Sequence, residues 1–209
     1  MAKLPPISQQ HRICVICEGL EDISYFNRLL DLKVWSSAYK FTTINAKSAS
    51  NIPARFEDAY HNNQYEIILI FCDTDKAPYR EYSQVKKKIN RFLGKQKADE
   101  KLIIFANPCT MQIILSHFGE VSLTSQGKKT NAALIEELTG VKDYDAHEEQ
   151  VKALCSVVIR RTYQDMKQRV SAINYPDTTP ASTNFSVFLD RFESDDTKWI
   201  KVILDYLRS

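Results

Sequence analysis

Acidic residues follow two apolar runs of this sequence, and their spacing suits magnesium chemistry. Asp73 and Asp75 come directly after the apolar run at 66–72, and Glu18 follows the run at 12–17. In extended backbone, side chains two residues apart point to the same face. Neighbouring carboxylates resist joint ionisation unless a cation lies between them, and hard oxygen ligands are those that magnesium prefers. The spacing predicts a site for Mg2+, or Mn2+, although acidic residues after strands are also common in turns.

These runs belong to an alternating pattern of strands and helices. Apolar, β-branched stretches typical of buried strands alternate with stretches whose apolar residues recur at helical spacing. Strands are predicted at 12–17, 40–46, 66–72 and 101–106, and helices at 22–35, 51–63, 79–94 and 109–118. The alternation predicts an α/β fold with a mostly parallel central sheet of about four strands flanked by helices. Ligands bind beyond the carboxyl ends of such strands, where the acidic residues lie.

The second half of the sequence has a helical pattern. It predicts a short helix at 132–138, a long helix over 145–170 and two further helices near 185–192 and 199–207. We therefore divide the chain into an α/β domain over 1–118 and a C-terminal helical extension over 119–209, which packs on that domain.

Three segments, in order, resemble a known group of proteins. Cys17-Glu18-Gly19 with Tyr25-Phe26 looks like the opening of RloB-like proteins, Asn107-Pro108-Cys109 with His117-Phe118 looks like a later motif of theirs, and the stretch 180–192 is similar to their closing segment. RloB-like proteins are prokaryotic members of the TOPRIM superfamily associated with phage defence and restriction, related to OLD-family nucleases. The TOPRIM signature is a glutamate after the first strand and a DxD after the third. The resemblance implies a TOPRIM-like fold over about 13–118.

The resemblance also implies roles for individual residues. Glu18, Asp73 and Asp75 match the metal and acid–base carboxylates, and Asp22 matches a second acidic position that helps to hold a second magnesium. The alternative for Asp22 is a first-turn aspartate that favours the helix dipole. RloB-like proteins carry an acidic residue shortly after the Asn-Pro-Cys motif, where this chain has Thr110-Met111-Gln112. This departure bears on two-metal nuclease chemistry more than on metal binding.

Two further residues are candidates for supporting the site. Gly19 predicts a tight turn in which the backbone approaches a ligand or the sheet. Asn107 could donate a hydrogen bond to the metal's ligands, and the alternative is an Asn-Pro turn that ends a strand.

Basic residues gather at two places. One group lies on the predicted helix after the DxD motif and the other in the second half, and the nucleic-acid-binding candidates are Lys86, Lys87, Arg91, Lys128 and Lys129. Such cations would bind phosphates with a strong dependence on salt. The alternative is a solvated helix face.

The bulk composition is that of an ordinary globular protein. The chain has 209 residues, of which 44% are hydrophobic and 26% charged, and a formal net charge of +2. No apolar run approaches the ~18 residues needed to span a bilayer, and the first twelve residues lack the apolar core of a signal peptide. The five cysteines are an odd number and favour buried thiols. We expect a cytoplasmic protein with no membrane partner.

These observations lead to two functional hypotheses. The first is a magnesium-dependent, phosphodiester-cleaving TOPRIM nuclease of prokaryotic defence that acts on DNA or RNA. The second is a non-catalytic TOPRIM module that binds nucleic acid or a separate ATPase subunit, since the chain has no P-loop of its own. A homo-oligomer is an open alternative in both cases.

Overall fold

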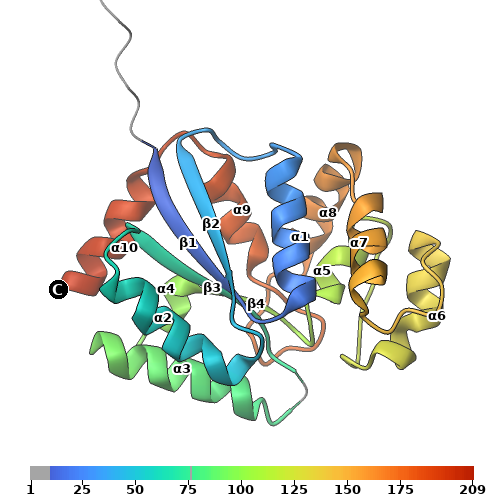
Figure 1. The fold of residues 1–209 in the computed structure, drawn as a ribbon, viewed down its shortest axis with the longest axis horizontal. Helices are drawn as coiled ribbons and strands as arrows, with labels where there is room; N and C mark the ends of the chain where they lie inside the picture. The colour runs from blue at the N-terminus through green and yellow to red at the C-terminus, as the bar shows by residue number, and fades with distance from the viewer. Residues whose placement is uncertain (1–9, 76) are drawn as a thin grey trace, which may run out of the picture.

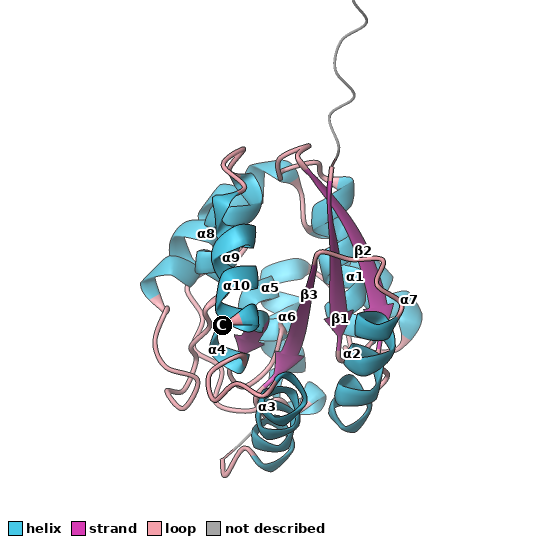
Figure 2. Ribbon diagram, turned by 90° about the vertical axis from the view of Figure 1, so that its left-hand side faces the viewer, coloured by secondary structure: helices cyan, strands magenta, loops and turns pink. Residues whose placement is uncertain are grey.

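The central sheet is parallel throughout. The computed structural model describes residues 10–75 and 77–209, and its four strands are β1 (His11–Cys17), β2 (Tyr39–Asn45), β3 (Ile67–Asp73) and β4 (Ile103–Ala106). They are ordered β2-β1-β3-β4, and all neighbours pair in parallel. Figure 2 shows β1, β2 and β3 running in the same direction. The predicted α/β fold with a parallel sheet is confirmed.

Helices follow each strand in the first half of the chain. They are α1 (Leu20–Asp31), the short 3-10 turn η1 (Ala49–Asn51), α2 (Ile52–His61), α3 (Arg80–Leu93), α4 (Asp99–Leu102) and α5 (Met111–Leu115). Gly94 ends α3 in the left-handed conformation, with φ of 66°, which glycine adopts without steric cost. Figure 1 shows α1 on one side of the strands and α2 with α3 on the other. Since both faces are covered, the central strands are apolar on both faces.

The second half is helical, but its predicted long helix is wrong. The helices are α6 (Lys128–Thr139), α7 (Glu148–Val157), α8 (Arg160–Ala172), α9 (Phe185–Glu193) and α10 (Lys198–Arg208). The stretch 145–170 breaks because Val158 and Ile159 adopt extended backbone and Val158 is fully buried. The freed carbonyl oxygen of Val158 accepts a hydrogen bond of 2.9 Å from the Arg28 side chain of α1. No described helix has the length and apolar character needed to cross a membrane.

Residues of the second half share the core of the sheet. Phe185 of α9 stacks on Phe71 of β3, with ring centroids 5.5 Å apart. The amide side chain of Asn184 bonds to the edge strand β4, donating to the Ile103 carbonyl oxygen at 2.8 Å and accepting from the Phe105 N–H at 2.9 Å. The C-terminal helices therefore pack directly on the sheet, while the domain division at residue 118 stays a prediction.

The strand order reverses direction between β1 and β3. The chain passes from β1 to its neighbour β2 and then crosses back to place β3 and β4 on the other side of β1. Open parallel sheets bind ligands at such a point, beyond the carboxyl ends of the strands, because the loops there diverge to opposite faces. The ends of β1 and β3 lie next to each other, since Cys17 pairs with Phe71. Residues that follow these two central strands therefore meet at the carboxyl-terminal end of the sheet.

Candidate functional site

Glu18 and Asp73 meet where the strand order reverses. The Glu18 N–H continues the ladder to the Phe71 carbonyl oxygen at 3.0 Å, and this fixes Glu18 at the end of β1. The backbone N–H of Asp73 then donates to Glu18 Oε2 at 3.1 Å. Two residues 55 positions apart in the chain thus lie in contact at the predicted edge.

Asp22 joins them from the first turn of α1. Its side chain is only 4% exposed, and Oδ2 accepts a hydrogen bond of 2.7 Å from the Gly19 N–H. This bond is that of a helix cap, and it supports the alternative reading of Asp22 as a first-turn residue. This position also brings Oδ1 of Asp22 toward Asp73. Asp22 therefore both caps α1 and belongs to the carboxylate cluster.

Thr110 lies between Asp22 and Asp73. Its hydroxyl contacts Asp22 Oδ1 and also lies 3.1 Å from Asp73 Oδ1, while its backbone N–H donates to the same Asp73 oxygen at 2.7 Å. One hydroxyl has one proton to donate. Both contacts are satisfied together when one of the two carboxyl groups keeps its own proton. The sequence marked Thr110 only as a departure from the family pattern, and the structure makes it the central bridge.

Asp75 reaches the same edge by a different backbone than expected. Its φ is 58°, in the left-handed region, and its N–H donates to the Pro108 carbonyl oxygen at 3.0 Å. The expectation of extended backbone at Asp73 and Asp75 is therefore wrong, because β3 ends at Asp73 and the chain turns at once. Repulsion from Asp75 still contributes to the raised pKa of Glu18, so the two carboxylates lie near each other.

The backbone conformation at position 19 does not require a glycine. Its φ is −140°, which any residue adopts, and an added Cβ would lie 3.5 Å from Asp22 Oδ2 in ordinary contact. The chain does bend at Glu18-Gly19, between β1 and α1, but this bend does not require a glycine.

Burial and mutual repulsion raise the pKa of these carboxyl groups. The pKa of Glu18 rises from 4.5 to about 8, first by burial and then by repulsion from Asp22. The pKa of Asp22 rises from 3.8 to about 6, chiefly by burial and against the hydrogen bonds from Thr110 and Gly19. Burial with repulsion from Asp22 and Glu18 raises the pKa of Asp73 well above its usual value. At neutral pH the cluster without a cation therefore holds protons.

Several oxygens of the cluster remain free for a ligand. Glu18 Oε1, Asp73 Oδ2 and both carboxylate oxygens of Asp75 accept no hydrogen bond from a described residue. No buried side-chain nitrogen or oxygen of the described residues lacks a partner, so the free oxygens of these partly buried side chains reach solvent. The donor set is all oxygen and open to water, as magnesium requires.

The carboxylates are not drawn together into a ready-made metal site. Within residues 10–75 and 77–209, no three side chains of His, Cys, Asp or Glu meet as a closed ligand group. Thr110 and the backbone N–H groups already engage oxygens of Glu18, Asp22 and Asp73. Magnesium keeps several waters and needs only one or two carboxylates, so it fits such an open arrangement.

A second group of side chains, not predicted as a unit, lines the cluster. Lys128, at the start of α6, forms an ion pair with Glu21, whose other oxygen accepts a hydrogen bond of 2.7 Å from the Tyr144 hydroxyl. Burial raises the pKa of Asp22 and of Asp75, and the positive charge of Lys128 offsets part of this rise. Lys128 was predicted from the sequence as a cation for phosphate, and its neighbours Glu21 and Tyr144 were missed. The only available signal for Glu21 was its position beside Asp22.

The other predicted basic residues differ in their surroundings. Lys86 is held by Asp177 at 2.6 Å and by Asp99 at 3.3 Å, so its charge is already paired. Lys87, Arg91 and Lys129 are exposed and form no ion pair with a described residue. Glu81, in the first turn of α3, contributes to the raised pKa of Glu18, so this turn lies beside the carboxylates.

Asn107 has a structural partner. Its side-chain amide donates to the Asp177 carbonyl oxygen at 2.8 Å, and its backbone N–H donates to the Ser182 carbonyl oxygen at 2.8 Å. Both bonds tie the end of β4 to the loop before α9. This contact favours the alternative reading of Asn107 as part of a turn.

Comparison of the chain with protein-family models, with curated proteins and with solved structures found no match. The resemblance to RloB-like and TOPRIM proteins therefore stays a prediction from three short segments.

Proposed function

We propose that this protein is a magnesium-dependent nuclease that cleaves phosphodiester bonds of DNA or RNA. One observation carries the proposal: Glu18 and Asp73 meet where the strand order reverses, and each keeps a carboxylate oxygen that faces solvent. Asp75 adds two further free oxygens. Clustered carboxylates at this edge are costly without a cation, so their joint presence favours a cation site.

The residues of the chain divide the work of such a reaction. Glu18, Asp73 and Asp75 would hold Mg2+ or Mn2+, with Asp22 behind them. When bound, the metal would neutralise charge on the phosphate and activate the attacking water. Glu18 is also the acid–base candidate, because in the metal-free protein its pKa of about 8 lies near neutral pH, where proton transfer is most effective. Its Oε1 accepts no hydrogen bond from a described residue and is therefore the oxygen left for a proton or for the metal.

Cations beside the carboxylates support a polyanionic substrate. Lys128 lies at the cluster, where it is partly buried and paired with Glu21, and the exposed Lys129 follows it in α6. Lys87 and Arg91 lie six and ten residues after Glu81 on α3, about 9 and 15 Å along the helix axis. Several cations along one helix can contact the phosphates of a nucleic-acid backbone.

A non-catalytic binding module is the second candidate, and Thr110 favours it. In place of an acidic residue after the Asn-Pro-Cys motif, a hydroxyl bridges Asp22 and Asp73. A neutral bridge between two carboxyl groups reduces the negative charge available to a second cation. In this alternative the chain binds nucleic acid or a separate ATPase subunit. A defence role and a cytoplasmic location follow from the sequence for both candidates and belong to this proposal.

Cleavage assays with matched variants test the proposal. The native protein is incubated with single- and double-stranded DNA and RNA, with Mg2+ or Mn2+, alone and with candidate ATPase partners. Asp73→Asn removes a charge from the cluster and should abolish metal-dependent cleavage while circular dichroism remains native. Asp58→Asn is the control, because Asp58 is exposed on α2 and, among the described residues, forms an ion pair only with Arg55, at 3.8 Å.

The opposite outcome is equally specific. If the native chain cleaves none of these substrates under any condition, and binding of a partner is the same in Asp73→Asn, the nuclease proposal fails and the binding module is retained. If Asp58→Asn loses cleavage as fully as Asp73→Asn, the carboxylate cluster is not the active site.

A further inference from the structure

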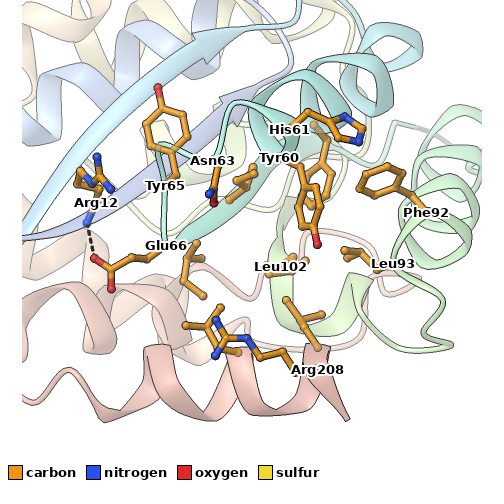
Figure 3. Close-up of a pocket in the computed structure, with 15 residues that line it drawn as sticks. Arg12, Tyr60, His61, Asn63, Tyr65, Glu66, Phe92, Leu93, Leu102 and Arg208 are labelled. Atoms are coloured by element: carbon orange, nitrogen blue, oxygen red, sulfur yellow. Dashed lines mark hydrogen bonds between the residues drawn. The ribbon is translucent and has the colours of Figure 1, made fainter.

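A large pocket lies at the amino-terminal end of the sheet, opposite the end that carries the carboxylates. Its volume is about 860 Å³, and its walls come from the amino ends of the strands, where Arg12, Glu66 and Ile67 lie, from the ends of α2 and α3, and from α10. Figure 3 shows residues of all these segments around one space. Nothing in the proposed reaction uses this pocket.

The floor of the pocket is apolar and aromatic. Phe56, Leu102 and Leu207 line it from three different helices or their ends. Tyr60 and Phe92 pack edge to face, with ring centroids 5.2 Å apart, and Tyr60 is 52% exposed. An apolar body that covers these side chains removes apolar surface from water, which is favourable.

Two arginines border this floor without an ion-pair partner. The guanidinium groups of Arg12 and Arg208 form no hydrogen bond or ion pair with any residue of the described chain. The carboxylate of Glu66, which also lines the pocket, is turned to His11 at 2.9 Å and to the Arg12 backbone N–H at 3.2 Å. Figure 3 shows Arg12 at one end of the pocket and Tyr60, His61 and Phe92 at the other.

We propose that this pocket binds a small amphipathic anion, with an aromatic or aliphatic body and a phosphate or carboxylate group. The body would lie on the apolar floor, and the anionic group would accept hydrogen bonds from Arg12 or Arg208 at the rim, since the guanidinium geometry suits phosphate and carboxylate alike. The pocket falls in the size range of small-molecule sites, about 300–1,000 Å³.

The dye 8-anilinonaphthalene-1-sulfonate is a suitable probe, because it combines an aromatic body with one anionic group. Its fluorescence titration on the full chain is compared with that of Nile red, which is apolar and uncharged. Arg12→Gln with Arg208→Gln removes both cations from the rim. Lys40→Gln with Arg161→Gln is the matched control, because it removes two exposed positive charges away from the pocket. Leu207→Trp narrows the pocket from α10.

We expect saturable binding of the anionic dye to the native protein and to the control. The double arginine variant should weaken that binding about tenfold or more, because hydrogen bonds to a charged group are lost, and leave Nile red unaffected. Leu207→Trp should weaken the binding of both dyes. Dodecanoate and adenosine monophosphate then distinguish the carboxylate and phosphate sources, since one of them should displace the dye and raise the melting temperature.

Three results would overturn the proposal. They are the absence of saturable dye binding to the folded native chain, equal weakening in the arginine variant and its control, and failure of both dodecanoate and adenosine monophosphate to displace the dye. If Leu207→Trp does not fold, the arginine pair alone decides, because both of its side chains are exposed. Cleavage activity does not enter these readouts, so they are independent of the proposed nuclease.

Discussion

Replacing Asp22 by asparagine should stabilise the metal-free protein, and the gain should appear only above acidic pH. Asp22 is 4% exposed, and its pKa rises from 3.8 in the unfolded chain to about 6 in the folded protein, with burial as the main cause. Each pKa unit corresponds to about 1.4 kcal/mol. The ionised side chain therefore costs the folded state about 3 kcal/mol at neutral pH, which Asp22→Asn removes.

The hydrogen bonds of Asp22 allow this exchange. The asparagine oxygen can accept from the Gly19 N–H, which lies 2.7 Å from Asp22 Oδ2, and its amide can donate to the Thr110 hydroxyl. The Thr110 proton then turns to Asp73 Oδ1, 3.1 Å away. Because an amide caps a helix less well than a carboxylate, we expect a net gain of about 1–2 kcal/mol.

The sign of the pH dependence follows from the raised pKa. A carboxyl group whose pKa is higher in the folded state gives its full stability below the unfolded value, here 3.8, and loses it as pH rises through about 6. Native protein and Asp22→Asn should therefore be equally stable near pH 4 and differ fully near pH 7. Magnesium should stabilise the native protein more than the variant, because it favours the ionised carboxylates.

Urea unfolding followed by tryptophan fluorescence, with a chelator or with magnesium, measures these differences. Trp35 and Trp199 are partly buried against the core and report on unfolding. Asp58→Asn, on the exposed side of α2, is the control and should show no pH-linked gain. A variant less stable than the native chain by about 1 kcal/mol or more at both pH values would refute the reasoning, because it would show that capping of α1 outweighs charge repulsion.

Four further predictions concern other parts of the molecule. Glu18→Gln should flatten the loss of stability that the native chain shows as pH rises from 4.5 through about 8, as measured by urea unfolding, and an unchanged pH profile would contradict the raised pKa. Thr110→Val removes the hydroxyl between two carboxyl groups and should cost about 1–3 kcal/mol in the same assay, whereas a neutral effect would mean that the bridge contributes nothing. Lys87→Glu with Arg91→Glu should weaken nucleic-acid binding and lower its salt slope by about two, and equal slopes would return α3 to a solvated face. Phe185→Ala, at a fully buried position on Phe71, should cost about 3–5 kcal/mol in a single unfolding transition, and two separate transitions would indicate that 119–209 folds apart from the sheet.

Short-range patterns in the sequence determined the sheet and the approximate place of the site. The apolar, β-branched runs predicted β1, β3 and β4, because strands buried on both faces must be apolar throughout, and the edge strand β2, whose side chains are mostly partly exposed, was predicted as well. The carboxyl-end rule then brought Glu18 and Asp73 to one edge, since parallel neighbours end together. These inferences depend on local pattern and on a general rule of topology, so one sequence was sufficient for them.

Only the tertiary structure decided which side chains contact one another in the site, because these contacts join residues far apart in the chain. Thr110 meets Asp22 across 88 positions, and Lys128 meets Glu21 across 107. Local spacing was misleading at Asp75, where the end of β3 turns the backbone to a φ of 58°.

The second half shows the same limit of local pattern. Helical periodicity continued through Val158 and Ile159, but burial of Val158 and the hydrogen bond from Arg28 end one helix and begin another there. The pocket at the far edge depends on α10 crossing to the ends of α2 and α3. Periodicity predicts that an element forms and which face it buries, whereas its partner is chosen by the packing of the whole chain.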